Sequence, residues 1–98
     1  MESLQIDKKY ISALKIFNSN VEDALSEFII LNLSKKISEF KNECEIYEKK
    51  YRINFESFEG RLKEKINEEN FEEDDDYMAW KFAEESKRLF QKRLEEIQ

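Results

Sequence analysis

Alternating and helical patterns of apolar side chains divide the start of the chain into two short elements. Positions 3 to 6 alternate between polar and apolar residues, a period of two that predicts a short strand or an extended arm. The polar positions are Ser3 and Gln5, and the apolar positions are Leu4 and Ile6. Asp7 is then placed to cap a helix. The apolar positions of that helix are Ile11, Leu14 and Phe17.

A long helix is predicted from near Asn20 to about Tyr51. Ser19 and Glu22 match a capping box, in which two side chains satisfy unpaired amide donors at the start of a helix. Nothing breaks the helical pattern that follows, and roughly 30 residues at about 1.5 Å each give an element of about 45 Å. Apolar side chains recur along it at alternating spacings of three and four. This seam consists of Ile30, Leu33, Ile37, Phe40, Cys44, Tyr47 and Tyr51.

The seam has two interpretations that the sequence leaves open. It can pack against a second copy of the chain as a coiled coil, which predicts a homodimer, or against later helices of its own chain. The first part of the same helix carries a different apolar stripe, formed by Val21, Leu25, Phe28 and Ile29. Because this stripe adds a second apolar side, we expect this end of the helix to be buried more completely than the rest. The N-terminal unit is therefore expected to be a separate packing module.

Two further helices are predicted in the second half. Asn54 can cap a short helix whose apolar side consists of Phe55, Phe58, Leu62 and Ile66. The aspartates at 74–76 can cap a last helix. Its apolar stripe consists of Tyr77, Trp80, Ala83, Phe90, Leu94 and Ile97. The chain has no Pro and one Gly, so the turn residues that many short strands need are missing. The predicted fold is all-α, a long helix plus shorter helices, with room for one short N-terminal strand that pairs in a dimer.

Charge is distributed unevenly along the 98 residues, whose formal net charge is -6. Residues 1–42 contain six lysines and six acidic residues, so the whole acidic excess lies in residues 43–98. In the run 68–76 only Asn70 and Phe71 are not acidic. Such a surface repels nucleic acid and attracts basic proteins. Residues 43–98 are therefore predicted to be an acidic helical partner-binding region, either distinct from residues 1–42 or continuous with them in one domain.

The cysteine and the hydropathy of the chain indicate its compartment. A lone Cys44 cannot form an internal disulfide, no apolar run is long enough to span a bilayer, and the N-terminus lacks the pattern of a signal peptide. These features predict a cytoplasmic protein that does not enter a membrane.

Residues suited to catalysis or to cofactor binding are scarce. There is no His to act as a general base or metal ligand, so Cys44 has no His with which to form a nucleophilic pair. The chain has no P-loop, dinucleotide fingerprint or zinc-binding cysteine spacing. The aspartates at 74–76 lack the spacing of a calcium-binding EF-hand loop. We expect no enzyme activity, no cofactor and no metal site.

Acidic and aromatic residues near the start of the last predicted helix form a candidate site for a basic protein. Carboxylates steer the encounter with a basic surface, and large aromatic side chains anchor protein interfaces. The alternative for the Trp is that it fills the chain's own small core. The candidate partner-binding residues are Glu72, Glu73, Asp74, Asp75, Asp76, Trp80 and Phe82.

The start of the chain follows the predicted order strand, helix, turn, helix. The four consecutive segments are SLQID, KKYISALKIF, NSN and VEDALSEFIILNL. This order resembles the ribbon-helix-helix family of small DNA-binding proteins and antitoxins, in which two chains pair their N-terminal strands and outward strand side chains enter the major groove. The resemblance implies that residues 1–42 are a dimerisation module in which Ser3 and Gln5 face DNA. Neither of these residues is Lys or Arg, and residues 1–42 carry no net positive charge.

The second half of the chain resembles small archaeal and bacterial proteins that accompany toxins as antitoxins. The resemblance rests on three segments: a charged helix ending in EKKY, the capped segment NFESFEGRL and the stretch DDDYMAWKF. Together the two resemblances imply an N-terminal module that dimerises and a C-terminal helical region that grips a toxin. The expected function is antitoxin-like neutralisation of a basic protein partner, such as a toxin ribonuclease. Two alternatives remain open, a DNA-binding ribbon-helix-helix regulator and a structural helical dimer or assembly adaptor.

Overall fold

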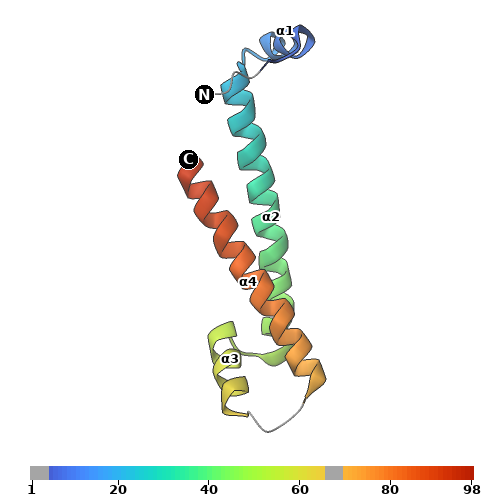
Figure 1. The fold of residues 1–98 in the computed structure, drawn as a ribbon, viewed down its shortest axis with the longest axis vertical. Helices are drawn as coiled ribbons and strands as arrows, with labels where there is room; N and C mark the ends of the chain where they lie inside the picture. The colour runs from blue at the N-terminus through green and yellow to red at the C-terminus, as the bar shows by residue number, and fades with distance from the viewer. Residues whose placement is uncertain (1–4, 66–69) are drawn as a thin grey trace.

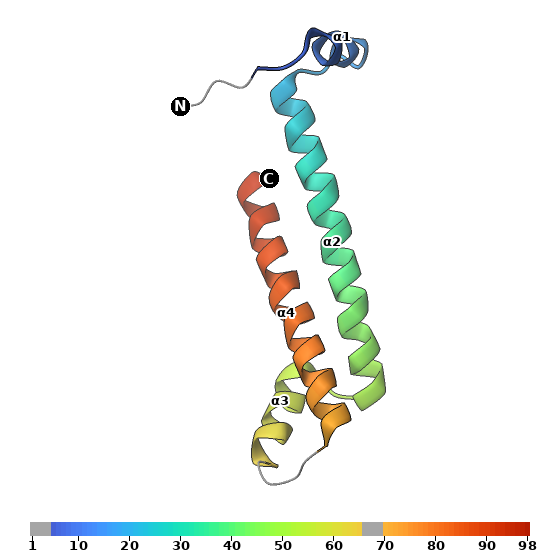
Figure 2. The same cartoon turned by 45° about the vertical axis from the view of Figure 1, so that its right-hand side comes forward.

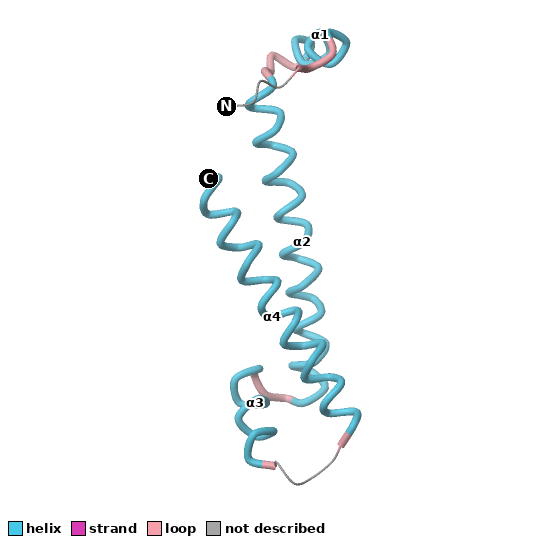
Figure 3. Tube along the Cα trace, viewed as in Figure 1, coloured by secondary structure: helices cyan, strands magenta, loops and turns pink. Residues whose placement is uncertain are grey.

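The computed structural model describes residues 5–65 and 70–98, and in these residues it contains helices and no strand (Figure 3). The expectation of an all-α chain is therefore confirmed for the described residues. Ser3 and Leu4 of the expected strand lie outside them, as does Ile66 of the expected short helix. Gln5 and Ile6 have no regular secondary structure. The helices, in chain order, are α1 (Lys8–Ile16), α2 (Val21–Tyr51), α3 (Phe55–Glu64) and α4 (Phe71–Ile97).

The two long helices form an antiparallel hairpin. In Figures 1 and 2, α2 runs from α1 to the opposite end of the molecule, and α4 returns beside it. The short helix α3 lies against the start of α4, at the end of the hairpin where α2 finishes. The principal extents of 63 × 29 × 21 Å reflect the length of α2. As a result, α1 and α3 lie at opposite ends of an elongated molecule.

Polar side chains define where each helix begins. Asp7 and Asn54 cap α1 and α3, as predicted, by accepting hydrogen bonds from backbone amides. The predicted capping box is wrong, because the side chain of Asn20, and not of Ser19, accepts the amide N–H of Asp23 at 2.8 Å. The prediction that the aspartates at 74–76 cap the last helix is also wrong. Asn70 accepts the amide N–H of Glu73 at 3.2 Å, so α4 begins at Phe71.

The earlier start of α4 places residues 72–76 of the acidic run inside the helix. Its first turn contains Glu72, Glu73 and Asp74, whose negative charges are favourable beside the unpaired amides of a helix N-terminus. The acidic residues therefore have fixed directions around α4. Some point toward α2 and α3, and others point toward solvent.

The buried core lies where α2, α3 and α4 meet. Its fully buried large side chains are Cys44, Phe58 and Trp80, with Phe55 and Ala83 beside them. The expectation that the first part of α2 is the more completely buried end is wrong. Leu25, Phe28 and Ile29 are exposed there, and α4 ends short of this part of α2 (Figures 1 and 2).

Candidate protein-binding surface

Trp80 occupies the centre of the core. Its ring lies 5.2 Å from that of Phe58 and 5.4 Å from that of Phe55, measured between centroids. The rings of Tyr47 and Tyr51, on α2, stack against it at 5.8 and 6.3 Å. No part of the side chain is exposed. The prediction that Trp80 anchors a partner is therefore corrected, and the core alternative describes its position.

The C-terminal part of the predicted seam packs within the chain. Phe40 stacks on Phe90 of α4 at 5.6 Å, and Tyr47 and Tyr51 contact Trp80 as described above. Cys44 is buried in the same core. The remaining seam residues, Ile30, Leu33 and Ile37, are half-buried on the same helix. From Phe40 to Tyr51 the structure thus shows the intrachain alternative, which leaves this part of the seam no free face for a second copy.

Two of the five candidate acidic residues form an internal clasp around Lys50. The Nζ atom of Lys50 donates to Glu72 at 2.8 Å and to Asp76 at 2.6 Å. The hydroxyl of Tyr51 also donates to Asp76, at 2.5 Å. We refer to these four residues as the Lys50 clasp. It joins the last turn of α2 to the first two turns of α4.

The clasp shifts the pKa values of its members. Burial opposes ionisation of Asp76, but hydrogen bonds from Lys50 and Tyr51 outweigh it and hold the pKa below the ordinary 3.8. Hydrogen bonds to Asp76 and Glu72 raise the pKa of Lys50. Burial, followed by the hydrogen bond to Asp76, raises the pKa of Tyr51 to about 12. Each shift favours the protonation state that the clasp contains near neutral pH.

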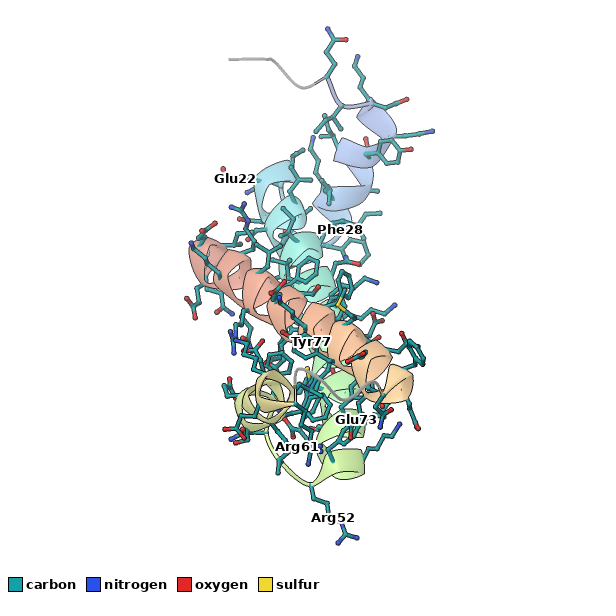
Figure 4. The ribbon with its side chains drawn as sticks, turned by 60° about the horizontal axis from the view of Figure 1, so that its bottom comes forward. Glu22, Phe28, Arg52, Arg61, Glu73 and Tyr77 are labelled. Carbon is teal, nitrogen blue, oxygen red and sulfur yellow. The ribbon has the colours of Figure 1, made fainter. Side chains whose placement is uncertain are left out.

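The other three acidic candidates differ in their surroundings. Glu73 lies 3.9 Å from Arg61 of α3, and Figure 4 shows both side chains at the same end of the molecule. Asp74 and Asp75 are exposed, and their carboxylates form no hydrogen bond or ion pair with the residues that the structure describes. These two carboxylates therefore remain available to a partner.

An apolar stripe runs along the solvent side of α4, opposite Trp80. At 100° per residue, positions 71, 78, 82 and 89 fall on one narrow face, half a turn away from position 80. Their side chains are between 52 and 75% exposed. We call this surface the outer stripe; it consists of Phe71, Met78, Phe82 and Leu89. Sequence reasoning predicted only Phe82, although the helical spacing of the other three was already visible.

Charged residues border the outer stripe unevenly. Asp74, Asp75 and Glu85 lie along its first two thirds, and Glu85 is also exposed without a partner among the described residues. Two basic residues on the same helix form ion pairs within the chain. Arg88 lies 3.1 Å from Glu56, and Arg93 lies 3.1 Å from Glu96. The surface that combines apolar side chains with unpaired carboxylates thus lies toward the start of α4.

The remaining candidates do not form a chemical site. Gln5 is exposed and Ser3 lies outside the described residues, so the structure does not place this pair against a ligand. A shallow depression of about 280 Å³ is lined by Glu48, Arg52, Ile53 and Asn54. The described segments contain no group of residues suited to hold a metal ion. They also contain no helix long and apolar enough to cross a bilayer.

Cys44 should be chemically inert in the folded chain. Burial, reinforced by the adjacent Glu84 carboxylate, raises the pKa of its thiol from 9.0 to about 12. Because the thiolate is the reactive form, we expect a thiol reagent such as Ellman's reagent to label Cys44 at least about a hundredfold more slowly in buffer than in denaturant. Equal rates in the two solvents, at the same pH, would show that this part of the core is open.

Comparisons with known proteins give no relative to which this surface could be compared. No protein-family model matches the chain, and no curated protein or solved structure is significantly similar to it.

Proposed function

We propose that this chain is an antitoxin-type binding protein that masks a basic protein, such as an RNA-degrading toxin, with the outer stripe of α4. The observation that supports the proposal is the exposed stripe of Phe71, Met78, Phe82 and Leu89 beside the exposed carboxylates of Asp74 and Asp75, which have no partner among the residues that the structure describes. An acidic run alone is usually only a solvated face. Here it borders apolar side chains that remain 52 to 75% exposed.

The size of the outer stripe suits a binding surface. Its exposed side chains present on the order of 400 Å² of apolar surface, within the range of the largest patches on single-chain proteins, which often have a function. Such a patch supplies the anchors that a partner desolvates. Its area alone falls short of a standard interface of about 800 Å² per partner, so we expect the flanking polar residues to contribute a rim.

The charges favour a basic partner. A ribonuclease must present cationic groups to the RNA backbone, and carboxylates that have no internal partner can attract the same groups. Asp74 and Asp75 meet this condition within residues 5–65 and 70–98, whereas Glu72 and Asp76 are held in the Lys50 clasp. We therefore assign the clasp a positioning role, in which it fixes the start of α4 so that the exposed carboxylates lie beside the stripe.

Titration calorimetry on a purified pair tests this proposal. The basic protein that the full chain captures from cells of its source is purified and titrated with the wild type, with Phe82→Ala, and with the double variant Asp74→Lys, Asp75→Lys. Ile46→Ala, on α2, is the control because Ile46 is 62% exposed, close to the 64% of Phe82. We expect Phe82→Ala to weaken binding about thirtyfold, as for an interface hot spot, and Ile46→Ala to have no effect.

Salt dependence tests the electrostatic part separately. The wild-type affinity should fall as ionic strength rises, and the double charge reversal should weaken binding and remove most of that dependence. A complex that is insensitive to salt, to the charge reversal and to Phe82→Ala would contradict the proposal.

A further inference from the structure

The N-terminal end of the molecule has a second large apolar surface. None of the α1 residues is buried, and the first third of α2 also exposes large side chains. Figure 4 shows Phe28 on the side of α2 from which α1 projects. We call this surface the N-terminal corner; its residues are Tyr10, Ile11, Phe17, Leu25, Phe28 and Leu31, and they are 38 to 78% exposed.

The chain's own elements leave this corner uncovered. The helix α4 packs against the other side of α2, and its C-terminus stops short of the first part of α2 (Figures 1 and 2). Positions 28 and 31 lie on the side of α2 away from the seam, because each is at least about 120° from the directions of Phe40 and Cys44 at about 100° per residue. Position 25 lies at the edge of the seam, about 60° from the direction of Phe40. An α4 longer by several turns would therefore still leave Phe28 and Leu31 exposed.

We propose that a second copy of this chain covers the N-terminal corner, forming a two-fold dimer through α1 and the first third of α2. The exposed side chains of the corner present on the order of 600 Å² of apolar surface. A polar rim would bring the contact to the ~800 Å² per partner of a standard interface. A helix of nine residues is too short to be stable in isolation, and none of the α1 residues is buried within the single chain. Contact with a second copy would therefore also explain why α1 is helical.

Charge favours a second copy over a basic partner at this end. Residues 1–42 contain equal numbers of lysines and acidic residues, so two such surfaces meet without net repulsion. The acidic excess lies toward the other end of a molecule 63 Å long. Two chains joined at their corners keep their acidic ends apart by many times the ~8 Å screening length at physiological salt. The dimer would present two outer stripes, but it does not depend on whether those stripes bind a partner.

Light scattering after size-exclusion chromatography tests the dimer with the full chain alone. Phe28→Asp places a charge in the corner, and Phe17→Asp does the same on α1. Ile46→Asp is the matched control, because Ile46 lies on the same helix as Phe28 at 62% exposure against 64%. Gln5→Pro separates this helix-mediated dimer from one that pairs N-terminal strands, since Pro removes a backbone donor from a strand. Far-UV circular dichroism establishes that each variant remains helical.

We expect wild type, Ile46→Asp and Gln5→Pro to be dimers at about 100 µM. The dimer dissociation constant of each corner variant should rise at least about a hundredfold, because each substitution occurs twice in a two-fold interface. A monomeric wild type at that concentration would overturn the proposal. So would a Phe28→Asp variant that is helical and dimeric, or a dimer that only Gln5→Pro disrupts. A wild-type chain that forms the dimer but binds no basic protein would overturn the proposed function and leave this inference intact.

Discussion

Replacing Trp80 with alanine is expected to lower the free energy of unfolding by about 3–5 kcal/mol. The side chain is fully buried and contacts rings from both α2 and α3, so its removal leaves a cavity at the point where three helices meet. A domain of this size has only about 5–15 kcal/mol of stability in total. Urea unfolding followed by circular dichroism should therefore show a largely unfolded or strongly destabilised variant.

Two further substitutions make this experiment specific. Phe82→Ala, on the outer stripe, should change the stability by less than about 1 kcal/mol, because Phe82 is largely exposed and keeps only an edge contact with Phe40 at 6.1 Å. Trp80→Phe should be milder than Trp80→Ala, since it retains an aromatic ring and removes an indole Nε1 that has no hydrogen-bond partner among the described residues. Equal losses for Trp80→Ala and Phe82→Ala would contradict the division of α4 into inner and outer faces.

Breaking the Lys50 clasp should have the next largest effect. Asp76→Asn removes the carboxylate that accepts from both Lys50 and Tyr51, and we expect a loss of about 1–2 kcal/mol in the free energy of unfolding. Asp75→Asn, one position earlier on the solvent side, is the control and should change the stability by less than about 0.5 kcal/mol. Similar losses for both variants would show that the clasp does not join α2 to α4.

The same clasp predicts how stability depends on pH. The pKa of Asp76 is lower in the folded chain than its ordinary 3.8, and the hydrogen bond from Tyr77 likewise lowers the pKa of Glu59 below 4.5. A group with a lowered folded pKa stabilises the fold above its unfolded pKa, and this contribution is lost as the pH falls through the folded value. The melting temperature should therefore decrease below about pH 4, and Asp76→Asn should make the decrease shallower. An unchanged acid profile in Asp76→Asn would contradict this assignment.

Local sequence patterns were sufficient to predict much of the helical framework. The 3.6-residue period and the caps Asp7 and Asn54 gave correct helices, because both depend on residues close together in the chain. The caps at Ser19 and at 74–76 were wrong because an asparagine stands next to each candidate segment. Asn20 and Asn70 both accept the amide three residues ahead, which fixes the helix start.

The assignment of faces could not be predicted in the same way. Periodicity shows that α4 has apolar residues on two sides, but only the partner helix determines which side is inside. Trp80 and Phe82 are two residues apart and thus point in different directions, so a single anchor pair was not geometrically available. The acidic run was likewise divided by packing: Asp76 faces Lys50, while Asp75 faces solvent.

Which chain covers the seam could not be predicted, for the same reason. A three-and-four spacing specifies an apolar face, not the chain that covers it. Phe40, Tyr47 and Tyr51 are covered by α3 and α4 of the same chain. The stripe containing Leu25 and Phe28 was predicted to be buried and is exposed in the single chain, which is why its cover is proposed to be a second copy.

We propose that α4 uses its inner face for the chain's own core and its outer stripe for a basic partner. The most direct test is an NMR titration of the full chain, labelled with ¹³C at the methionine methyl groups and ¹⁵N at the indole, with the purified basic protein. The chain has two methionines and one tryptophan, so Met78 and Trp80 each report one face of α4 with minimal overlap. Partner binding should shift or broaden the Met78 methyl signal strongly and leave the Trp80 indole signal nearly unchanged. A strong change at Trp80 with none at Met78 would contradict the claim.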